Sequence, residues 1–158
     1  MSIRSFVIGL STLLISLTAF AETHTHATAK VTFTTPDGWE TKKNDEMLAT
    51  KSADDAAGVL FMIVDGEKLE EAVEEAEKAA KGAVPDLKME GEPKEAELNG
   101  MKTIFIEGAG TADGDAVEVG LAVIQTPSGK FLLALGMAKK GAHEKEIGEI
   151  FQSLKPIK

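Results

Sequence analysis

The sequence predicts an α+β fold, an antiparallel β-sheet flanked by helices. Strand-like apolar runs are joined by short turns, and short turns connect antiparallel neighbours. Two segments, 69–83 and 147–154, instead repeat apolar residues at steps of three and four, which is typical of amphipathic helices. The order of elements is strands, helix, strands, helix, which disfavours a doubly wound parallel sheet.

Residues 1–21 are predicted to be a secretory signal peptide. Arg4 and the free amine make a positively charged start, an apolar run extends from Phe6 to Leu17, and small residues stand at Ala19 and Ala21. The apolar run is shorter than the ~20 residues that a membrane-spanning helix needs. We therefore expect cleavage after Ala21, no membrane span in the mature protein, and a location in the periplasm of a Gram-negative cell or outside the cell.

Two parts follow the signal peptide. Residues 22–29 are polar and rich in Thr, lack apolar periodicity, and are expected to form a flexible N-terminal arm. A weaker cleavage site after Ala29 would remove this arm. Residues 30–158 are numerous enough for one hydrophobic core and are expected to fold as a single α+β domain.

The domain is expected to begin with a strand at Val31, which a Pro-Asp-Gly turn at residues 36–38 connects to Trp39. Met47–Ser52 is the second expected strand. The run Gly58–Val64 is apolar at successive positions, which is typical of a strand covered on both faces. We therefore place Gly58–Val64 centrally in the sheet.

The second half of the domain is predicted to contain a helix, several hairpins and a final helix. Asn99-Gly100 is a strong signal for a two-residue hairpin turn, whereas residues 110–114 are expected to form a looser turn. The expected elements are a helix from Asp65-Gly66 to about Gly82, strands at Lys94–Leu98, Met101–Gly108, Ala116–Gln125 and Phe131–Met137, and a helix from about Ala142 with a core stripe of Ile147, Ile150, Phe151 and Leu154.

Both ends of residues 30–158 resemble the PsbP-like superfamily. The opening strand and turn, Val31–Trp39, are similar to the "strand, Pro-x-Gly-Trp" start of that family. A long strand, Lys130–Met137, followed by a helix with the pattern Ile147-x-x-Ile-Phe-x-Ser-Leu154, is similar to its close. The resemblance implies an α-β-α sandwich. It also implies a binding or assembly factor, because members share no active site, and it places no catalytic residue in this chain.

Composition excludes several classes of function. The chain of 158 residues has a formal net charge of −9, and Arg4 is its only Arg, so loss of the signal peptide would make the protein still more negative. A protein that follows a phosphate backbone needs a cationic face, so we expect no nucleic-acid partner. Cys and Tyr are absent, which excludes thiol nucleophiles, disulfides, thiolate metal sites and phenolic acids.

A catalytic site is not predicted, although one alternative stays open. His143 is the only His outside residues 22–29, and none of Ser52, Ser128 and Ser153 lies in a Gly-x-Ser-x-Gly elbow. The acidic pairs Asp54-Asp55 and Asp113-Gly114-Asp115 are expected to be solvated turn residues. The alternative is a small hydrolase or a metal-dependent enzyme that uses a carboxylate cluster with His143, and such an enzyme would need carboxylates with shifted pKa values.

A metal site is predicted as a hypothesis at the processed N-terminus. After cleavage at Ala21 the protein would begin with Glu22, Thr23 and His24, and the Glu22 amine, the Thr23 and His24 amides and the His24 imidazole could wrap copper(II) or nickel(II). His26 could add a further contact. The competing interpretation is that two His residues in a polar tail are accidental.

Together these observations predict an exported, non-catalytic binding or accessory protein of the bacterial cell envelope. The partner would be a protein or a small molecule in the envelope, and the protein is expected to be a monomer. A binding protein should show one exposed apolar patch or groove, whereas an enzyme should show buried carboxylates converging with His143.

Overall fold

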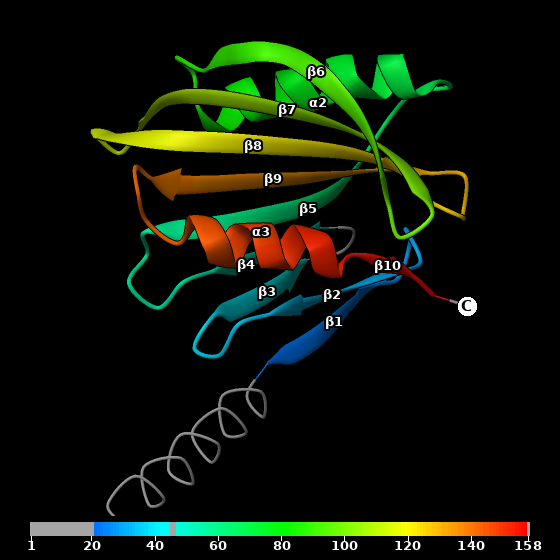
Figure 1. The fold of residues 1–158 in the computed structure, drawn as a ribbon, viewed down its shortest axis with the longest axis horizontal. Helices are drawn as coiled ribbons and strands as arrows, with labels where there is room; N and C mark the ends of the chain where they lie inside the picture. The colour runs from blue at the N-terminus through cyan, green and yellow to red at the C-terminus, as the bar shows by residue number, and fades with distance from the viewer. Residues whose placement is uncertain (1–20, 45–46, 158) are drawn as a thin grey trace, which may run out of the picture.

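A seven-stranded antiparallel sheet forms the centre of the computed structural model, which describes residues 21–44 and 47–157 (Figure 1). Neighbouring strands follow the order β3-β4-β5-β9-β8-β7-β6. The strands are β3 (Glu40–Asn44), β4 (Met47–Lys51), β5 (Ala57–Val64), β6 (Lys88–Leu98), β7 (Met101–Ala112), β8 (Asp115–Gln125) and β9 (Phe131–Lys139).

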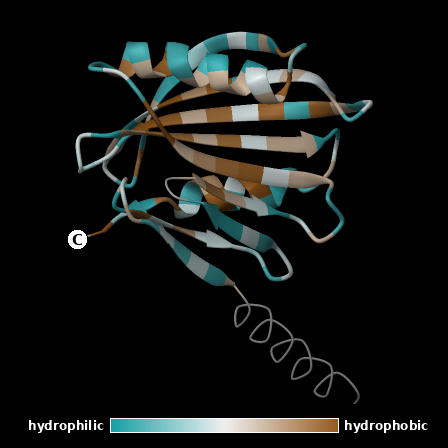
Figure 2. Ribbon diagram, turned by 180° about the vertical axis from the view of Figure 1, so that it is seen from behind, coloured by the Kyte–Doolittle hydropathy of each residue, from teal (hydrophilic) through white to brown (hydrophobic). Residues whose placement is uncertain are grey.

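A second, three-stranded sheet and two helices complete the described part of the chain. The small sheet has the order β1-β2-β10 and contains β1 (Glu22–His26), β2 (Val31–Thr35) and β10 (Lys155–Pro156). The helices are α2 (Leu69–Ala83) and α3 (Glu144–Ser153). We call the face of the large sheet that α3 covers the front face, and the face that α2 covers the back face (Figures 1 and 2).

Each face of the large sheet carries its own hydrophobic core. The back core joins α2 to β7, β8 and β9, and small side chains such as Ala72, Ala76 and Ala80 let the helix lie close to the sheet. The front core joins α3 and the small sheet to β4, β5 and β9. Phe33 of β2 stacks on Phe61 of β5 with ring centroids 4.0 Å apart, which ties the two sheets together.

The hairpin between β6 and β7 also fixes the end of α3. Asn99 and Gly100 have φ values of 48° and 87°, the left-handed pair that a tight two-residue turn requires. The Asn99 side chain then donates hydrogen bonds to the carbonyls of Gln152 and Leu154, at 3.2 and 2.6 Å. The turn therefore supplies partners for carbonyl groups that the end of a helix leaves unsatisfied.

The structure confirms the predicted fold class, with antiparallel strands and helices on both faces. It also contains elements that the sequence analysis missed, which are β1, β3, β10 and the first half of β6. The pairing of β6 with β7 shifts register between Glu90 and Lys94, where Gly91 has a φ of 74°. This irregularity hides the strand, because it interrupts the alternation from which a strand is recognised.

The prediction of a flexible arm at residues 22–29 was wrong. Glu22–His26 form β1, which pairs antiparallel with β2 from Glu22 opposite Thr35 to His26 opposite Val31. His26 is 2% exposed, and Ala29 is fully buried. Backbone pairing and burial of the end of the segment order it, although its sequence has no apolar periodicity.

Two further expectations concern the ends of elements. The looser turn expected at residues 110–114 is shorter, because β7 continues to Ala112 and only Asp113 and Gly114 turn, with φ values of 50° and 83°. The predicted signal peptide lies outside the described residues, apart from Ala21. Within residues 21–44 and 47–157, neither helix has the length and apolar character of a membrane span.

Candidate functional site

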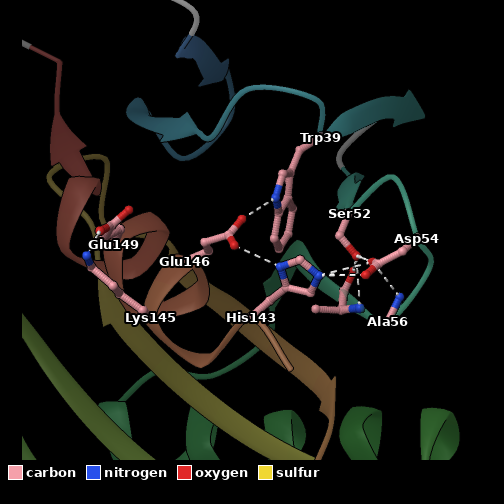
Figure 3. Close-up of polar contacts among 9 residues, drawn as sticks. Trp39, Ser52, Asp54, Ala56, His143, Lys145, Glu146 and Glu149 are labelled. Carbon is pink, nitrogen blue, oxygen red and sulfur yellow. Dashed lines mark hydrogen bonds and ion pairs between the residues drawn. The ribbon is translucent and has the colours of Figure 1, made fainter. Parts of the chain in front are cut away.

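One polar cluster gathers side chains from three separate segments around the start of α3 (Figure 3). The His143 Nδ1 lies 2.8 Å from Glu146 Oε1, and the His143 Nε2 lies 2.9 Å from Asp54 Oδ2. Trp39 Nε1 donates to the other oxygen of Glu146 at 2.8 Å. Ser52 Oγ donates to Asp54 Oδ1 at 2.6 Å. We call these five residues the His143 cluster.

Local geometry places each member of the cluster. Trp39 follows the Pro-Asp-Gly turn after β2, and Asp54 lies in the turn between β4 and β5. His143 precedes the first residue of α3 and has a left-handed backbone with φ 52°, which aims its ring away from the helix axis and toward Asp54 (Figure 3). The Trp39 and His143 rings meet edge to face, with centroids 5.9 Å apart.

Electrostatics in the cluster favour an ion network. The hydrogen bond from Ser52, then those from His143 and the Ala56 amide, hold the pKa of Asp54 well below its ordinary value. Hydrogen bonds to Asp54 and Glu146 raise the pKa of His143 above its ordinary value. Burial alone would raise the pKa of Glu146, but the hydrogen bonds from His143 and Trp39 outweigh it, and this pKa is lowered.

The contacts of the cluster link three separate segments of the chain to one another. Carboxylates occupy both ring nitrogens of His143, so neither nitrogen faces a serine hydroxyl as a nucleophilic relay requires. Of the two carboxylates that converge on His143, Asp54 is exposed and Glu146 is half-buried, with 59% and 37% of their side chains accessible. The adjoining pocket of about 340 Å³ is lined by cluster members and by Asp37 and Gly38.

A second site lies on the front face, on the opposite side of the first turn of α3. It is a groove of about 440 Å³ between the helix and the exposed parts of β6, β7 and β8. Four glutamates line it, and we call it the acidic groove: Glu90 of β6, Glu107 of β7, Glu118 of β8 and Glu144 of α3. Gly120, Gly136 and Gly148 also line it, and the first two are direct partners in the pairing of β8 with β9.

The acidic groove crowds like charges together. Glu90 stands directly opposite Glu107 in the pairing of β6 with β7, an arrangement that destabilises a sheet. A hydrogen bond to Glu144, burial and the charge of Glu144 raise the pKa of Glu118. Among the described residues, no basic side chain lies within 4.0 Å of any of the four groove carboxylates.

The acidic pairs singled out in the sequence meet at a third pocket, of about 370 Å³, which Asp55, Asp113 and Asp115 line together. Two of them are neutralised by lysines. Lys51 Nζ lies 2.6 Å from Asp55, and Lys139 Nζ lies 3.1 Å from Asp115. In contrast to the acidic groove, this pocket has cations of its own.

The four residues of the hypothetical metal site are spread along β1. The His24 ring packs on Phe33, and its Nε2 lies 3.1 Å from Thr35 Oγ1 and 3.2 Å from Thr41 Oγ1. His26 Nδ1 accepts the Ala29 amide at 3.2 Å. Successive amides of a strand point to opposite sides, so four nitrogens could surround one ion only if β1 opened. The site at Glu22, Thr23, His24 and His26 stays a prediction, and no group of three or more potential ligands among the described residues is arranged to hold a metal.

The remaining serines have structural roles. Ser128 Oγ donates to the carbonyls of Thr28 and Ala29, which ties the turn after β8 to the turn after β1. Ser153 Oγ accepts the Thr34 amide at 2.8 Å and so links α3 to β2. The Ser128 hydroxyl therefore joins the large sheet to the small one, and the Ser153 hydroxyl joins α3 to the small sheet.

Comparison with known proteins identifies the fold. No protein-family model and no curated protein matches the chain. Among solved structures, cyanobacterial PsbP (CyanoP) from Synechocystis superposes with a TM-score of 0.60 at 10% identity, over 86% of this chain and 92% of that one. The fold is PsbP-like.

Two other solved structures have similar scores. LpqN of Mycobacterium tuberculosis, which is involved in cell envelope biogenesis, has a TM-score of 0.60 at 12% identity, over 85% of this chain and 89% of that one. A protein from Bacteroides thetaiotaomicron has a TM-score of 0.61 at 11% identity over 87% of this chain. This chain spans about half, 48%, of the Bacteroides protein. The resemblance seen at both ends of the sequence is thereby confirmed at the level of the fold.

Sequence analysis found part of these sites. His143 and Asp54 were singled out, but separately, and Trp39 and Glu146 were not connected with them. None of the four groove glutamates was singled out. No local pattern connects them, because they come from three strands and a helix that are brought together only in the folded protein.

Proposed function

We propose that this PsbP-like chain is an exported, non-catalytic binding protein of the cell envelope, and that its acidic groove receives a cationic segment of a partner protein. The envelope assignment draws support from LpqN, a neighbour in fold that is involved in envelope biogenesis. It also agrees with the signal peptide predicted at residues 1–21.

The groove carries the proposal because, among the described residues, its four carboxyl groups have no basic side chain in ion-pair contact. Glu90 and Glu107 face each other across two strands, and no basic group within the described chain pairs with either. Like charges in direct opposition weaken the fold, so a positively charged partner would relieve a cost that this chain carries alone. At Gly148 of α3, which lines the groove, no atom lies within 4 Å of the position that a Cβ would take, and this leaves room for an incoming chain.

The non-catalytic assignment is supported by the His143 cluster. An enzyme built on carboxylates with His143 would need buried acids and a ring nitrogen free to take a proton from substrate. Asp54 is instead well exposed, and both ring nitrogens of His143 bond to carboxylates. We expect neither metal-dependent nor hydrolytic chemistry at this cluster.

To test the proposal, hexalysine is added as a probe to the protein that begins at Glu22, and its binding is monitored by nuclear magnetic resonance. We expect the amide signals of Gly120, Gly136 and Gly148 to shift at low salt, and the shifts to shrink as salt rises. Signals of Gly38 and Gly129, which lie in turns away from the groove, should stay in place.

A matched pair of charge variants separates the groove from the general negative charge of the protein. The double variant Glu90→Gln/Glu107→Gln should weaken hexalysine binding at least about fivefold, which corresponds to roughly 1 kcal/mol. The control Glu70→Gln/Glu74→Gln removes the same charge from the exposed side of α2 and should change binding less than twofold. Equal losses in the two variants would refute the groove as the binding site.

A further inference from the structure

We propose that the first turn of α3 is a pH-sensitive latch, which two proton-dependent contacts hold against the large sheet in mild acid and release as the pH rises. One contact is the His143 cluster and the other is a carboxyl pair in the acidic groove. They lie on the two sides of the same helical turn, because His143 precedes α3 and Glu144 is its first residue.

The His143 contact needs a proton on both ring nitrogens. An imidazolium donates to Asp54 in the turn between β4 and β5 and to Glu146 in α3 at the same time. A neutral ring keeps one N–H, so its other nitrogen would present a lone pair to a carboxylate. The charged groups around the ring are all acidic: Asp54, Glu146 of α3, and Asp37 in the turn after β2, which lines the same pocket. Among the described residues, no Lys side chain lines this pocket to replace the lost proton.

The carboxyl contact needs one proton between two acids. Glu118 of β8 and Glu144 of α3 both line the acidic groove. The hydrogen bond to Glu144 that raises the pKa of Glu118 requires that one of the two carboxyl groups be protonated. The other groups that act on Glu118 are Glu90 of β6, which opposes its ionisation, and Lys140 beyond β9, which favours it. When the shared proton leaves, two carboxylates face each other across the gap between helix and sheet.

Both contacts respond to pH in the same direction. The pKa of Glu118 and the pKa of His143 are both raised in the folded protein, so the fold binds the proton more tightly than the unfolded chain does. Each contact is present in full below the ordinary pKa of its group, 4.5 for Glu and 6.5 for His, and is lost as the pH rises through the raised value. Asp54 and Glu146 set the lower limit, because their pKa values are lowered in the folded protein. The stability that they contribute is complete above their ordinary pKa values and is lost as the pH falls through the lowered ones.

The latch would also affect binding of a cationic segment in the acidic groove, and this part of the inference rests on the proposed function. Release of the turn would free Glu144 and ionise Glu118, which makes the acidic groove more negative and more accessible. Binding of a cationic segment would therefore strengthen as the pH rises from mild acid. The latch itself needs no partner and is tested without one.

Amide hydrogen exchange provides the test, with a matched control inside the same chain. The Ile147 amide donates the first helical hydrogen bond of α3 to the His143 carbonyl at 3.0 Å, and the Ala72 amide makes the equivalent bond of α2 to Lys68 at 3.1 Å. After correction for intrinsic exchange, we expect protection at Ile147 to fall about fivefold between pH 5 and pH 9, the upper end of what a partly exposed ion pair contributes. Protection at Ala72 should stay within twofold.

Two variants show which contact causes the fall in protection at Ile147. Glu118→Gln keeps a hydrogen-bond donor to Glu144 at every pH and should remove the more acidic part of the profile. His143→Asn keeps a residue that tolerates the left-handed backbone and should remove the part near neutral pH. The double variant should give a flat profile.

The latch is overturned if Ile147 follows Ala72 at every pH, or if the double variant keeps the dependence of the native protein. A flat profile at Ile147 together with hexalysine binding in the groove would remove the latch and leave the proposed function in place. A pH-dependent profile without hexalysine binding would do the reverse.

Discussion

The two sides of the first turn of α3 differ in whether their carboxylates have a basic partner. On the side of His143, an imidazole lies between two carboxylates and each polar atom of the cluster has a partner. On the side of Glu144, four carboxylates share a groove without a cation within ion-pair distance among the described residues. The difference teaches that polar groups paired with one another link segments of the chain, whereas carboxylates without a nearby cation leave negative charge available to a partner.

The largest expected effect on stability comes from removing the Trp39 ring of the His143 cluster. Trp39 is 8% exposed, belongs to the front core and donates to Glu146. Trp39→Ala should lower the free energy of unfolding by about 3 kcal/mol, because a large buried ring and its hydrogen bond are lost together. Urea denaturation followed by far-ultraviolet circular dichroism measures this change.

A variant in the acidic groove provides the control for Trp39→Ala. Glu107 is exposed and makes no ion pair among the described residues, so Glu107→Ala should change the free energy of unfolding by less than about 0.5 kcal/mol. A loss at Glu107 as large as that at Trp39 would contradict the assignment of the groove to a partner.

An intermediate effect on stability is expected at Gly136, one of two paired glycines beneath α3. A Cβ at Gly136 would come within 3.0 Å of Ile147 Cγ2 and 3.2 Å of Phe151 Cζ, so Gly136→Ala should push the helix outward and lower the free energy of unfolding by about 1–2 kcal/mol. Its cross-strand partner Gly120 has Phe151 at an ordinary 3.8 Å.

Gly120→Ala is therefore the matched control for Gly136→Ala. It should leave stability unchanged or raise it slightly, because alanine restricts the unfolded chain more than glycine does. Thermal unfolding of the two variants side by side decides the matter. Equal melting temperatures would show that α3 does not lie as closely on β9 as the structure places it.

The smallest effect is a shift in a titration that the single tryptophan of this chain reports. Trp39 meets the His143 ring, and an imidazolium at that position should quench its fluorescence. Because Asp54 and Glu146 raise the pKa of His143 above 6.5, the native protein should regain fluorescence only as the pH rises past that value. The stability that the charged cluster provides is complete below pH 6.5 and is lost over the same rise.

Asp54→Asn should move this fluorescence midpoint to lower pH, since the hydrogen bond to Asp54 is the largest cause of the raised pKa. Glu118→Gln changes a carboxylate on the other side of the turn and should leave the midpoint in place. A midpoint that is identical in the native protein and in Asp54→Asn would break the assignment of the signal to the His143 cluster.

The sequence predicted the fold better than the sites, for a physical reason that particular residues show. The apolar stripe at Ile147, Ile150, Phe151 and Leu154 and the turn at Asn99-Gly100 are local patterns, and both are confirmed in the structure. Asp54 and His143 are separated by most of the large sheet in the order of the chain. Only the pairing of β5 with β9 brings their segments together.

β1 shows the limit of periodicity most clearly. Residues 22–26 alternate polar types with no apolar face, so nothing local distinguishes them from a mobile tail. The backbone of β2 offers them a complete set of partners, and the Phe33 ring packs against His24. An edge strand of this kind is stabilised mainly by its neighbour, which the local pattern does not describe.

The sequence by itself determined the α+β class, the two amphipathic helices and the hairpins between β6 and β9, because these follow from local periodicity and from turn residues. The tertiary structure alone decided which charges meet. It brought His143 between Asp54 and Glu146, and it left four glutamates together in one groove. Coulomb interactions depend on distance in space, and residues distant in the chain become neighbours only through the pairing of strands and the seating of α3 on the sheet.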